Sequence, residues 1–356
     1  QSSDIAFLQY TGGTTGISKG AMLTHRNIIA NMMQISAWIT AKLTEGEEVV
    51  MTPLPLYHIF SLTVNCLAFA KIGANIVLIT NPRDIPAFIK ELKTSRPTAM
   101  SVVNTLIVAL LHDKSLTGVD FSRLKITVAG GMALQTPVAK QWMETTKTVI
   151  IEGYGLTETS PLASVNPFEG GKLGTIGLPA PSTEMRVIDD NGKEVPCGTS
   201  GELCVRGPQV MKGYWNQAEE TARVLSSDGW LRTGDIAEMA EDGYFKIVDR
   251  KKDMILVSGF NVYPNEVEEV AVSNPKVKEA AAVGVPDEKS GEVVKLFVVK
   301  KDPSLTAAEL ISFCHRLLTS YKVPKHIEFI AELPKNNVGK ILRRELRDRE
   351  KHPASH

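Results

Sequence analysis

The sequence has few cysteines and no cysteine pattern that would bind a metal or form a disulfide framework. Its four cysteines, Cys66, Cys197, Cys204 and Cys314, lie far apart, and no two of them form a Cys-x-x-Cys pair. The seven histidines also lack the spacing of a metal site. We therefore expect buried free thiols in a reducing environment and no structural zinc site.

Long apolar runs and an excess of one charge are missing as well. The longest strongly apolar stretch, residues 59–70, ends at Lys71 after twelve residues, whereas a membrane-spanning helix needs about 20. Forty basic residues balance forty acidic ones, so no overall field attracts the chain to nucleic acid. We expect no transmembrane segment and no nucleic-acid partner.

What the sequence does contain is an alternation of short apolar runs and helical patterns. Strands are predicted at residues 5–10, 48–52, 74–80, 98–103, 125–129 and 148–151, and helices after Thr24 and around residues 58–71, 84–95, 104–113 and 135–146. Such alternation predicts an α/β fold with a mostly parallel sheet. After Gly170, short strands separated by turns predict a small antiparallel barrel or sheet, and a mixed unit follows residues 249–253.

The most informative segment is residues 10–20, which contains four glycines, three threonines and one lysine. Glycine lets backbone amides approach an oxyanion, threonine adds donors, and lysine adds a positive charge. No register matches a Walker-type loop. The segment predicts a loop that binds the phosphates of ATP, and the alternative is a flexible surface turn. The candidate residues are Thr11, Gly12, Gly13, Thr14, Thr15, Gly16 and Lys19.

A second motif, residues 153–161, directly follows a predicted strand. Ligands of open α/β sheets bind at the carboxyl ends of strands. Tyr154 has the chemistry to stack on a purine, Thr157 to contact a phosphate, and Glu158 to hold the Mg²⁺ that accompanies ATP. The alternative is a polar turn with a solvent-facing glutamate. Gly130 and Gly131 end the preceding strand in the same way and bring backbone close to the same edge.

Four further residues carry weaker signals. Asp235 follows a tight turn and Arg250 follows a strand, which suits a ribose contact, although an aspartate in a turn is often a simple cap. His58 lies in an apolar setting, where a satisfied core or helix-cap histidine is the common outcome. Lys340 is by default a solvated lysine among forty basic residues.

Several long motifs occur in one order and carry a family resemblance. Residues 229–255 look like the fatty acyl-CoA synthetase motif, and residues 257–266 and 338–346 continue it. Across all 356 residues the chain resembles the adenylate-forming superfamily of acyl-CoA synthetases, adenylation domains and luciferases. It is similar to bacterial long-chain fatty acid-CoA ligases. Ser18 stands where the family usually has proline, and the first part of the family's large domain is expected to be missing, so the chain is expected to be a fragment.

The resemblance implies a large domain with a parallel sheet, helices and a small β-barrel-like subdomain, and a small mobile α+β C-terminal domain. The implied boundaries are 1–170 for the remaining large α/β domain, 171–249 for its β-rich subdomain, 250–252 for a hinge and 253–356 for the small domain. The family first forms an acyl-adenylate from ATP and a carboxylate, and then transfers the acyl group to CoA. The implied ligands are ATP, Mg²⁺, coenzyme A and a fatty acid.

The resemblance also implies a role for each candidate residue. Those in the nucleotide site are Thr11, Gly12, Gly13, Thr14, Thr15, Gly16 and Lys19 at the phosphates, Gly131, Tyr154 and Gly155 near adenine, and Asp235 with Arg250 at the ribose. Those in the chemistry are Thr157 at the α-phosphate, Glu158 at Mg²⁺, Lys340 between the carboxylate and the α-phosphate, and His58 near the acyl carboxylate. Those tied to movement of the small domain are the hinge residue Lys252 and Gly259 near the pantetheine channel.

Several alternatives stay open for substrate and location. No acidic residue occurs between Glu48 and Asp84, which disfavours an amino-acid substrate, and small and apolar residues around Val103 and Gly131 suit an alkyl tunnel. A medium-chain or aryl acid-CoA ligase, and a non-catalytic ATP-binding fragment, remain alternatives. A cytoplasmic enzyme is expected, with peripheral contact at the cytoplasmic face of the inner membrane and a homodimer left open.

Overall fold

The computed structural model describes residues 1–11, 18–39 and 42–351. It divides into two compact units. The first comprises Gln1–Leu134, Val138–Thr233 and Ala237–Ile247, and the second comprises Gln135–Pro137, Gly234–Ile236 and Val248–His356. The predicted phosphate-binding residues Gly12, Gly13, Thr14, Thr15 and Gly16 lie outside the described residues.

The main sheet of the first unit has seven strands. They are β3 (Val49–Thr52), β4 (Asn75–Leu78), β5 (Ala99–Val102), β6 (Ile126–Ala129), β7 (Ile150–Gly155), β8 (Leu162–Val165) and β9 (Leu178–Pro179). Their order is β4-β3-β5-β6-β7-β8-β9, parallel from β4 to β7 and antiparallel beyond. All four residues of β5 are buried, as expected for a strand whose two faces are both covered. The predicted parallel sheet is confirmed.

The helices of the first unit are α1 (His25–Ile39), α2 (Phe69–Lys71), α3 (Ile85–Ser95), α4 (Asn104–His112), α5 (Thr136–Thr146) and α6 (Ala218–Val224). Helices α2 to α5 lie between successive parallel strands, whereas α1 precedes β3 and α6 follows β11. Thr24 caps α1 as predicted, because its hydroxyl accepts the Asn27 amide at 3.2 Å. The segment predicted as a helix around residues 58–71 differs in kind, since Ser61–Ala68 forms a π-helix, a form often found at functional sites.

The rest of the first unit is β-rich. Strands β1 (Ile5–Tyr10) and β2 (Gly20–Thr24) form an antiparallel hairpin. A four-stranded sheet follows, with the order β10 (Glu184–Ile188), β11 (Gly201–Arg206), β12 (Leu231–Met239) and β13 (Phe245–Arg250). Two sequence expectations were wrong here. Asp235 lies inside β12 and not in a turn, and Arg250 is the last residue of β13.

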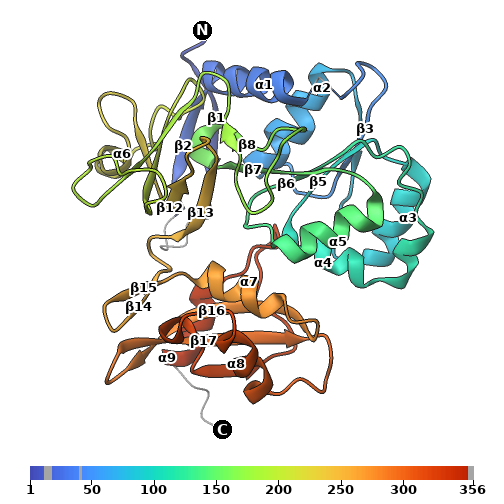
Figure 1. The fold of residues 1–356 in the computed structure, drawn as a ribbon. Helices are drawn as coiled ribbons and strands as arrows, with labels where there is room; N and C mark the ends of the chain where they lie inside the picture. Colours follow the sequence, from blue (N-terminus) through green and yellow to red (C-terminus); the bar gives the residue numbers. More distant parts are fainter. Residues whose placement is uncertain (12–17, 40–41, 352–356) are drawn as a thin grey trace. The chain divides into compact units, whose positions relative to one another are not determined.

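The second unit is built on one long hairpin. Strands β16 (Val277–Asp287) and β17 (Gly291–Lys300) pair antiparallel, and β14 (Ile255–Val257), β15 (Phe260–Val262) and β18 (His326–Phe329) complete the sheet. Figure 1 shows helices α7 (Pro264–Val272), α8 (Ala307–His315) and α9 (Arg343–Lys351) packed around this sheet in orange and red. Alternate residues of the hairpin belong to separate apolar clusters, so both of its faces are buried.

The expectations about transmembrane segments and about buried cysteines can be compared with the structure. None of the helices in the described part of the chain is long and apolar enough to span a membrane. Cys204 and Cys314 are buried as predicted, but Cys197 is exposed because it lies in the turn between Pro196 and Gly198.

Candidate functional site

The carboxyl edge of the parallel sheet gathers several predicted residues of the first unit. A Cβ added to Gly130, just after β6, would lie 3.3 Å from the carbonyl oxygen of Gly153 in β7 and 3.3 Å from the ring of Phe60. Gly131 has a φ of +78°, and its added Cβ would lie 3.9 Å from the Val103 side chain. The backbone is therefore closely packed where strands β5, β6 and β7 end, which is where open α/β sheets bind ligands.

The predicted phosphate loop lies in sequence between β1 and β2. Tyr10 lies opposite Gly20 in the register of the two strands, and the Thr11 amide donates to the Lys19 carbonyl oxygen at 2.8 Å. The hairpin holds the two ends of the loop together, so Thr11 and Lys19 are presented from adjacent points. On its other edge, β2 bonds to residues 212–215, since the Met22 amide donates to Gly213 at 2.8 Å.

Tyr214 connects two charges that the sequence predicts for nucleotide binding. Its hydroxyl donates to Glu158 Oε1 at 2.6 Å, and the Lys19 ammonium lies 5.1 Å from the centre of its ring. The Lys19 ammonium also forms an ion pair with Glu220 in α6. The structure thus brings the loop lysine and the predicted metal-binding glutamate to one tyrosine.

The chemistry of Tyr214 and Glu158 follows from this contact. Burial raises the pKa of the Tyr214 hydroxyl, and the neighbouring Glu158 charge raises it further, so Tyr214 stays a hydrogen-bond donor. In the described residues no group of three histidine, cysteine or acidic side chains could hold a metal ion. A single carboxylate at Glu158 still fits Mg²⁺ bound together with nucleotide phosphates, because Mg²⁺ keeps several waters and takes one or two protein carboxylates.

Gly155, the last residue of β7, has the least room for a side chain among the described glycines. A Cβ at this position would lie 1.9 Å from the Pro161 carbonyl oxygen, so only glycine fits. Thr157 opens the short helical turn that follows. The neighbouring Tyr154 packs its ring against an apolar cluster that includes Ala163 and Phe245. Its predicted contact with adenine stays a prediction.

His58 lies just before the π-helix, near the same sheet edge as Phe60. Its Nδ1 accepts the Phe60 amide at 3.3 Å, and its carbonyl oxygen accepts the Leu62 amide at 3.0 Å. The ring is partly buried and locally hydrogen-bonded, which agrees with a helix-cap histidine. This geometry leaves the predicted role at the acyl carboxylate untested.

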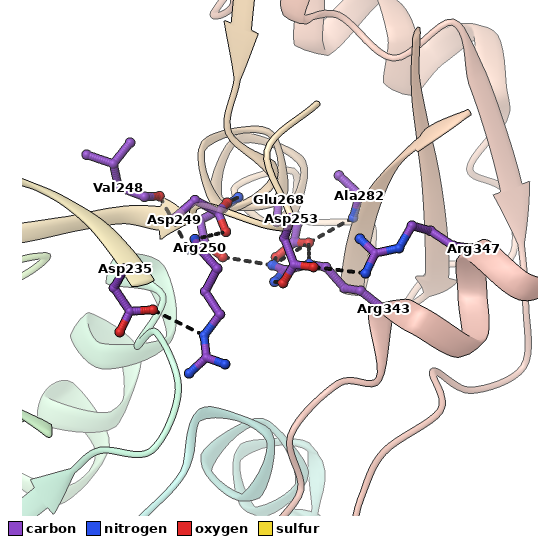
Figure 2. A network of polar contacts seen from close by, with 10 residues as sticks. Asp235, Val248, Asp249, Arg250, Asp253, Glu268, Ala282, Arg343 and Arg347 are labelled. Carbon is purple, nitrogen blue, oxygen red and sulfur yellow. Dashed lines mark hydrogen bonds and ion pairs between the residues drawn. The ribbon is translucent and has the colours of Figure 1, made fainter. Parts of the chain in front are cut away.

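The second unit gathers charged residues of its own. The Arg250 Nε forms an ion pair with Asp235 Oδ1 at 3.2 Å, as Figure 2 shows. Burial lowers the pKa of Lys340 to about 7, and the charges of Arg250 and Lys252 act in the same direction while Asp235 opposes them. The positive charges of Arg250, Lys252 and Arg343 thus act on Lys340 and are partly offset by Asp235.

Gly259 lies in the two-residue turn between β14 and β15. Ser258 and Gly259 have φ values of +51° and +84°, which is the left-handed geometry of a tight hairpin. An added Cβ at Gly259 would meet nothing within 4 Å. The turn is therefore open, and the predicted pantetheine contact of Gly259 stays a prediction.

Sequence reasoning missed Tyr214 and Glu220. Glu220 is 201 residues from Lys19, and local periodicity carries no information at such a separation. The run Gly213-Tyr214-Trp215 places two aromatic residues after a glycine, and that signal could have marked Tyr214 as a candidate. The signal for Glu220 is weaker, since acidic residues are common in the first turn of a helix.

These features define a class of protein: a two-unit α/β protein with a mostly parallel sheet, a glycine- and threonine-rich segment between two paired strands, and a cluster of cations in its smaller unit. The family described as "AMP-binding enzyme" matches residues 1–215, and its C-terminal domain matches residues 266–340. The chain belongs to this AMP-binding enzyme family. The predicted superfamily and its α/β fold are confirmed.

Individual relatives agree with this assignment. The chain is 60% identical to a long-chain-fatty-acid-CoA ligase of Escherichia coli O6:H1 over 97% of its length, and it spans 62% of that relative. ATP-bound MatB from Rhodopseudomonas palustris has a TM-score of 0.91 at 32% identity, with 100% of this chain and 70% of MatB covered. An anthranilate CoA ligase in complex with anthranoyl-AMP has a TM-score of 0.92 at 29% identity, covering 99% and 69%.

Proposed function

We propose that this chain is part of an enzyme that activates a long-chain fatty acid with ATP and transfers the acyl group to coenzyme A. The observation that carries the proposal is the meeting of Lys19 and Glu158 at Tyr214, beside a loop suited to phosphates. The 60% identity to a long-chain-fatty-acid-CoA ligase supports the choice of substrate. Because the chain spans 62% of that relative, the activity of the whole protein is a proposal.

In the first step, a fatty carboxylate attacks the α-phosphorus of ATP and pyrophosphate leaves. Lys19, with Thr14 and Thr15, binds the outer phosphates, and Thr157 contacts the α-phosphate. Lys340 stabilises the charge that develops between the carboxylate and the α-phosphate. Lys340 suits this role because its pKa is lowered, so its amine can take up a proton and gain charge when an anion binds.

The remaining proposed nucleotide contacts are those to the base, the ribose and the metal ion. Tyr154 and Gly155, with Gly131, lie at the adenine, and Asp235 with Arg250 binds the ribose. Glu158 holds Mg²⁺, which neutralises charge on the phosphates when it is bound.

In the second step, the thiol of coenzyme A attacks the acyl carbon and AMP leaves. Rotation at Lys252 withdraws Lys340 and brings the Gly259 turn to the pantetheine channel. His58 lies beside the acyl carboxylate and closes the channel between the steps. Since ATP and coenzyme A are the co-substrates, we place the reaction in the cytoplasm. Peripheral contact with the inner membrane and a homodimer stay predictions.

The experiment that tests the function measures both products with a panel of acids. The purified chain is given ATP, Mg²⁺ and short, medium, long or aryl acids, and pyrophosphate and acyl-AMP are measured; coenzyme A is then added and the thioester is followed. We expect the largest kcat/KM with long chains, because each buried methylene contributes about 0.8 kcal/mol. The E. coli relative is the positive control.

The other outcomes identify the alternatives. Pyrophosphate release restricted to medium-chain or aryl acids would identify a different acid-CoA ligase, an alternative supported by the fold similarity to the anthranilate CoA ligase. Nucleotide binding without pyrophosphate release, while the control is active, would identify a non-catalytic ATP-binding fragment.

A further inference from the structure

Lys340 lies on a tightly bonded hairpin of the second unit. We call residues 334–342 the lysine hairpin. Its ends pair as the Leu342 amide donates to the Pro334 carbonyl at 2.9 Å, and the Asn336 amide donates to the Lys340 carbonyl at 3.0 Å. The Asn336 side-chain oxygen also accepts the Lys340 amide at 2.9 Å. The backbone of Lys340 is thus held from both sides, which limits its local motion.

One end of the lysine hairpin is attached to β16. The Lys335 ammonium contacts both carboxylate oxygens of Glu279 at 2.7 and 2.9 Å. Leu333 and Leu346, which flank the hairpin in sequence, are buried in the same apolar cluster on one face of the β16–β17 hairpin. These contacts place the hairpin on the sheet, and Ile341, directly after Lys340, packs against the same cluster.

The other end is attached through Arg343, the first residue of α9. Its guanidinium contacts Glu268 of α7 in a forked arrangement, with Nη2 at 2.8 and 2.7 Å from the two carboxylate oxygens and Nε at 3.0 Å from Oε1. Glu268 also accepts the Ala282 amide at 2.8 Å, and Arg343 donates to the Asn265 side chain at 2.8 Å. Forked arginine–carboxylate pairs fix orientation as well as distance.

Helix α9 also contacts the segment that contains the predicted hinge residue Lys252. Asp253 accepts Arg347 Nη2 at 2.9 Å and lies 3.8 Å from Arg343 Nη1. Asp249 accepts the backbone amides of Arg250 at 2.6 Å and Asn265 at 2.8 Å. Figure 2 shows these side chains converging between the end of β13, α7 and α9. Lys252 lies between the two aspartates in sequence.

We infer that Arg343 is a positioning residue that ties the lysine hairpin to the hinge segment 249–253 through Glu268 and Asp253. Any movement of segment 249–253 is then transmitted to the start of α9, and Lys340 lies three residues before that start. The inference rests on the proposed function for its catalytic consequence only. The placement of Lys340 itself depends on contacts within the second unit.

The test compares Arg343→Lys with Arg344→Lys in the full chain. The first variant keeps the charge and loses the fork. The second changes the next residue of the same helix, whose side chain is exposed and forms an ion pair with Asp348. Adenylate formation should fall roughly 10- to 100-fold in Arg343→Lys, since a misplacement of about 1 Å can cost that much. Thioester formation from supplied acyl-AMP should stay unchanged, as should both steps in Arg344→Lys.

Hydrogen exchange supplies a readout that needs no activity. The Lys340 and Leu342 amides should exchange at least about tenfold faster in Arg343→Lys, while those of β16 and β17 keep their protection. Equal loss of both half-reactions, faster exchange throughout the second unit, or no change in either measurement would overturn the inference. If the wild-type chain forms no adenylate, the proposed function fails, but the exchange result still decides the positioning role. If Arg343→Lys does not fold, Asp253→Asn, which leaves the Glu268 fork intact, is measured in its place.

Discussion

At the scale of single residues, Tyr214 contacts two charged side chains that we propose bind ATP and its metal ion. It donates to Glu158 and lies under the Lys19 ammonium, while Glu220 pairs with the same ammonium. A triphosphate would compete with Glu220 for Lys19, because both are anions. Breaking the Lys19–Glu220 ion pair therefore makes the free energy of nucleotide binding less favourable.

Glu220→Gln should release Lys19 and tighten ATP binding by about two- to fivefold, the range expected for a partly exposed ion pair. Isothermal titration calorimetry measures the Kd, and Glu219→Gln, one residue earlier and exposed, is the matched control. Weaker binding in Glu220→Gln, or an equal change in both variants, would contradict the assignment of Lys19 to the phosphates.

Lys340 should titrate near neutral pH. Its pKa is lowered by burial first and then by Arg250, to about 7 from an ordinary value of 10.5. Because the unfolded chain binds the extra proton between these values, the destabilising effect of Lys340 is fully present below about pH 7 and is relieved as pH rises toward 10.5. An anionic ligand should raise this pKa.

Carbon-13 methylation of the lysines followed by NMR titration measures the Lys340 pKa, and Lys340→Arg identifies its resonance. A midpoint near 7 that moves upward with ATP and Mg²⁺ is the expected result. A midpoint near 10.5 without ligand would show that the ammonium is well solvated.

At the scale of elements, the end of β7 decides how the candidate site is shaped. Gly155 and Gly153 lie two residues apart in the same strand, but their surroundings differ. A Cβ at Gly155 would lie 1.9 Å from a backbone oxygen, whereas one at Gly153 would make an ordinary contact at 3.4 Å with a leucine side chain. Of these two glycine positions, only Gly153 can therefore accept a side chain.

Gly155→Ala should lower the free energy of unfolding by about 1–3 kcal/mol or more, because backbone has to move to relieve the overlap. Gly153→Ala is the matched control and should cost well under that amount. Urea unfolding followed by tryptophan fluorescence measures both. Equal stability of the two variants would mean that the turn after β7 is not held as described.

The order of elements could largely be predicted, but their form could not. Alternating apolar runs located β3 to β7, because buried parallel strands leave a strong local signal. The sequence carries no local signal for the π-helix at Ser61–Ala68 or for the start of β12 at Leu231. Both depend on neighbouring segments, so Asp235 was expected in a turn and was found in a strand.

At the scale of the whole molecule, the chain combines one unit with the predicted phosphate loop and a second unit that carries Lys340. The proposed reaction uses them in sequence: adenylate formation needs Lys340, and thioester formation needs it withdrawn. The two half-reactions should therefore respond differently to changes in the second unit, whereas loss of the phosphate loop should affect the step that uses ATP.

Lys340→Ala should slow adenylate formation by about 10²- to 10³-fold, the usual effect of removing a preorganised charge from a transition state. Thioester formation from supplied acyl-AMP should be spared. Pyrophosphate release and CoA thioester formation, measured separately, check the split, with Arg344→Lys, whose side chain is exposed, as the control. Loss of both steps in Lys340→Ala would count against its role.

The sequence alone determined the family, the parallel sheet and the candidate residues, because motifs and periodicity are local properties of the chain. Only the tertiary structure decided that Lys19 pairs with Glu220, that Tyr214 contacts Glu158, and that Arg343 binds Glu268, 75 residues away. Such pairs form when the topology brings distant segments together and burial makes each polar group find a partner. That requirement acts on the folded chain, so no local pattern records it.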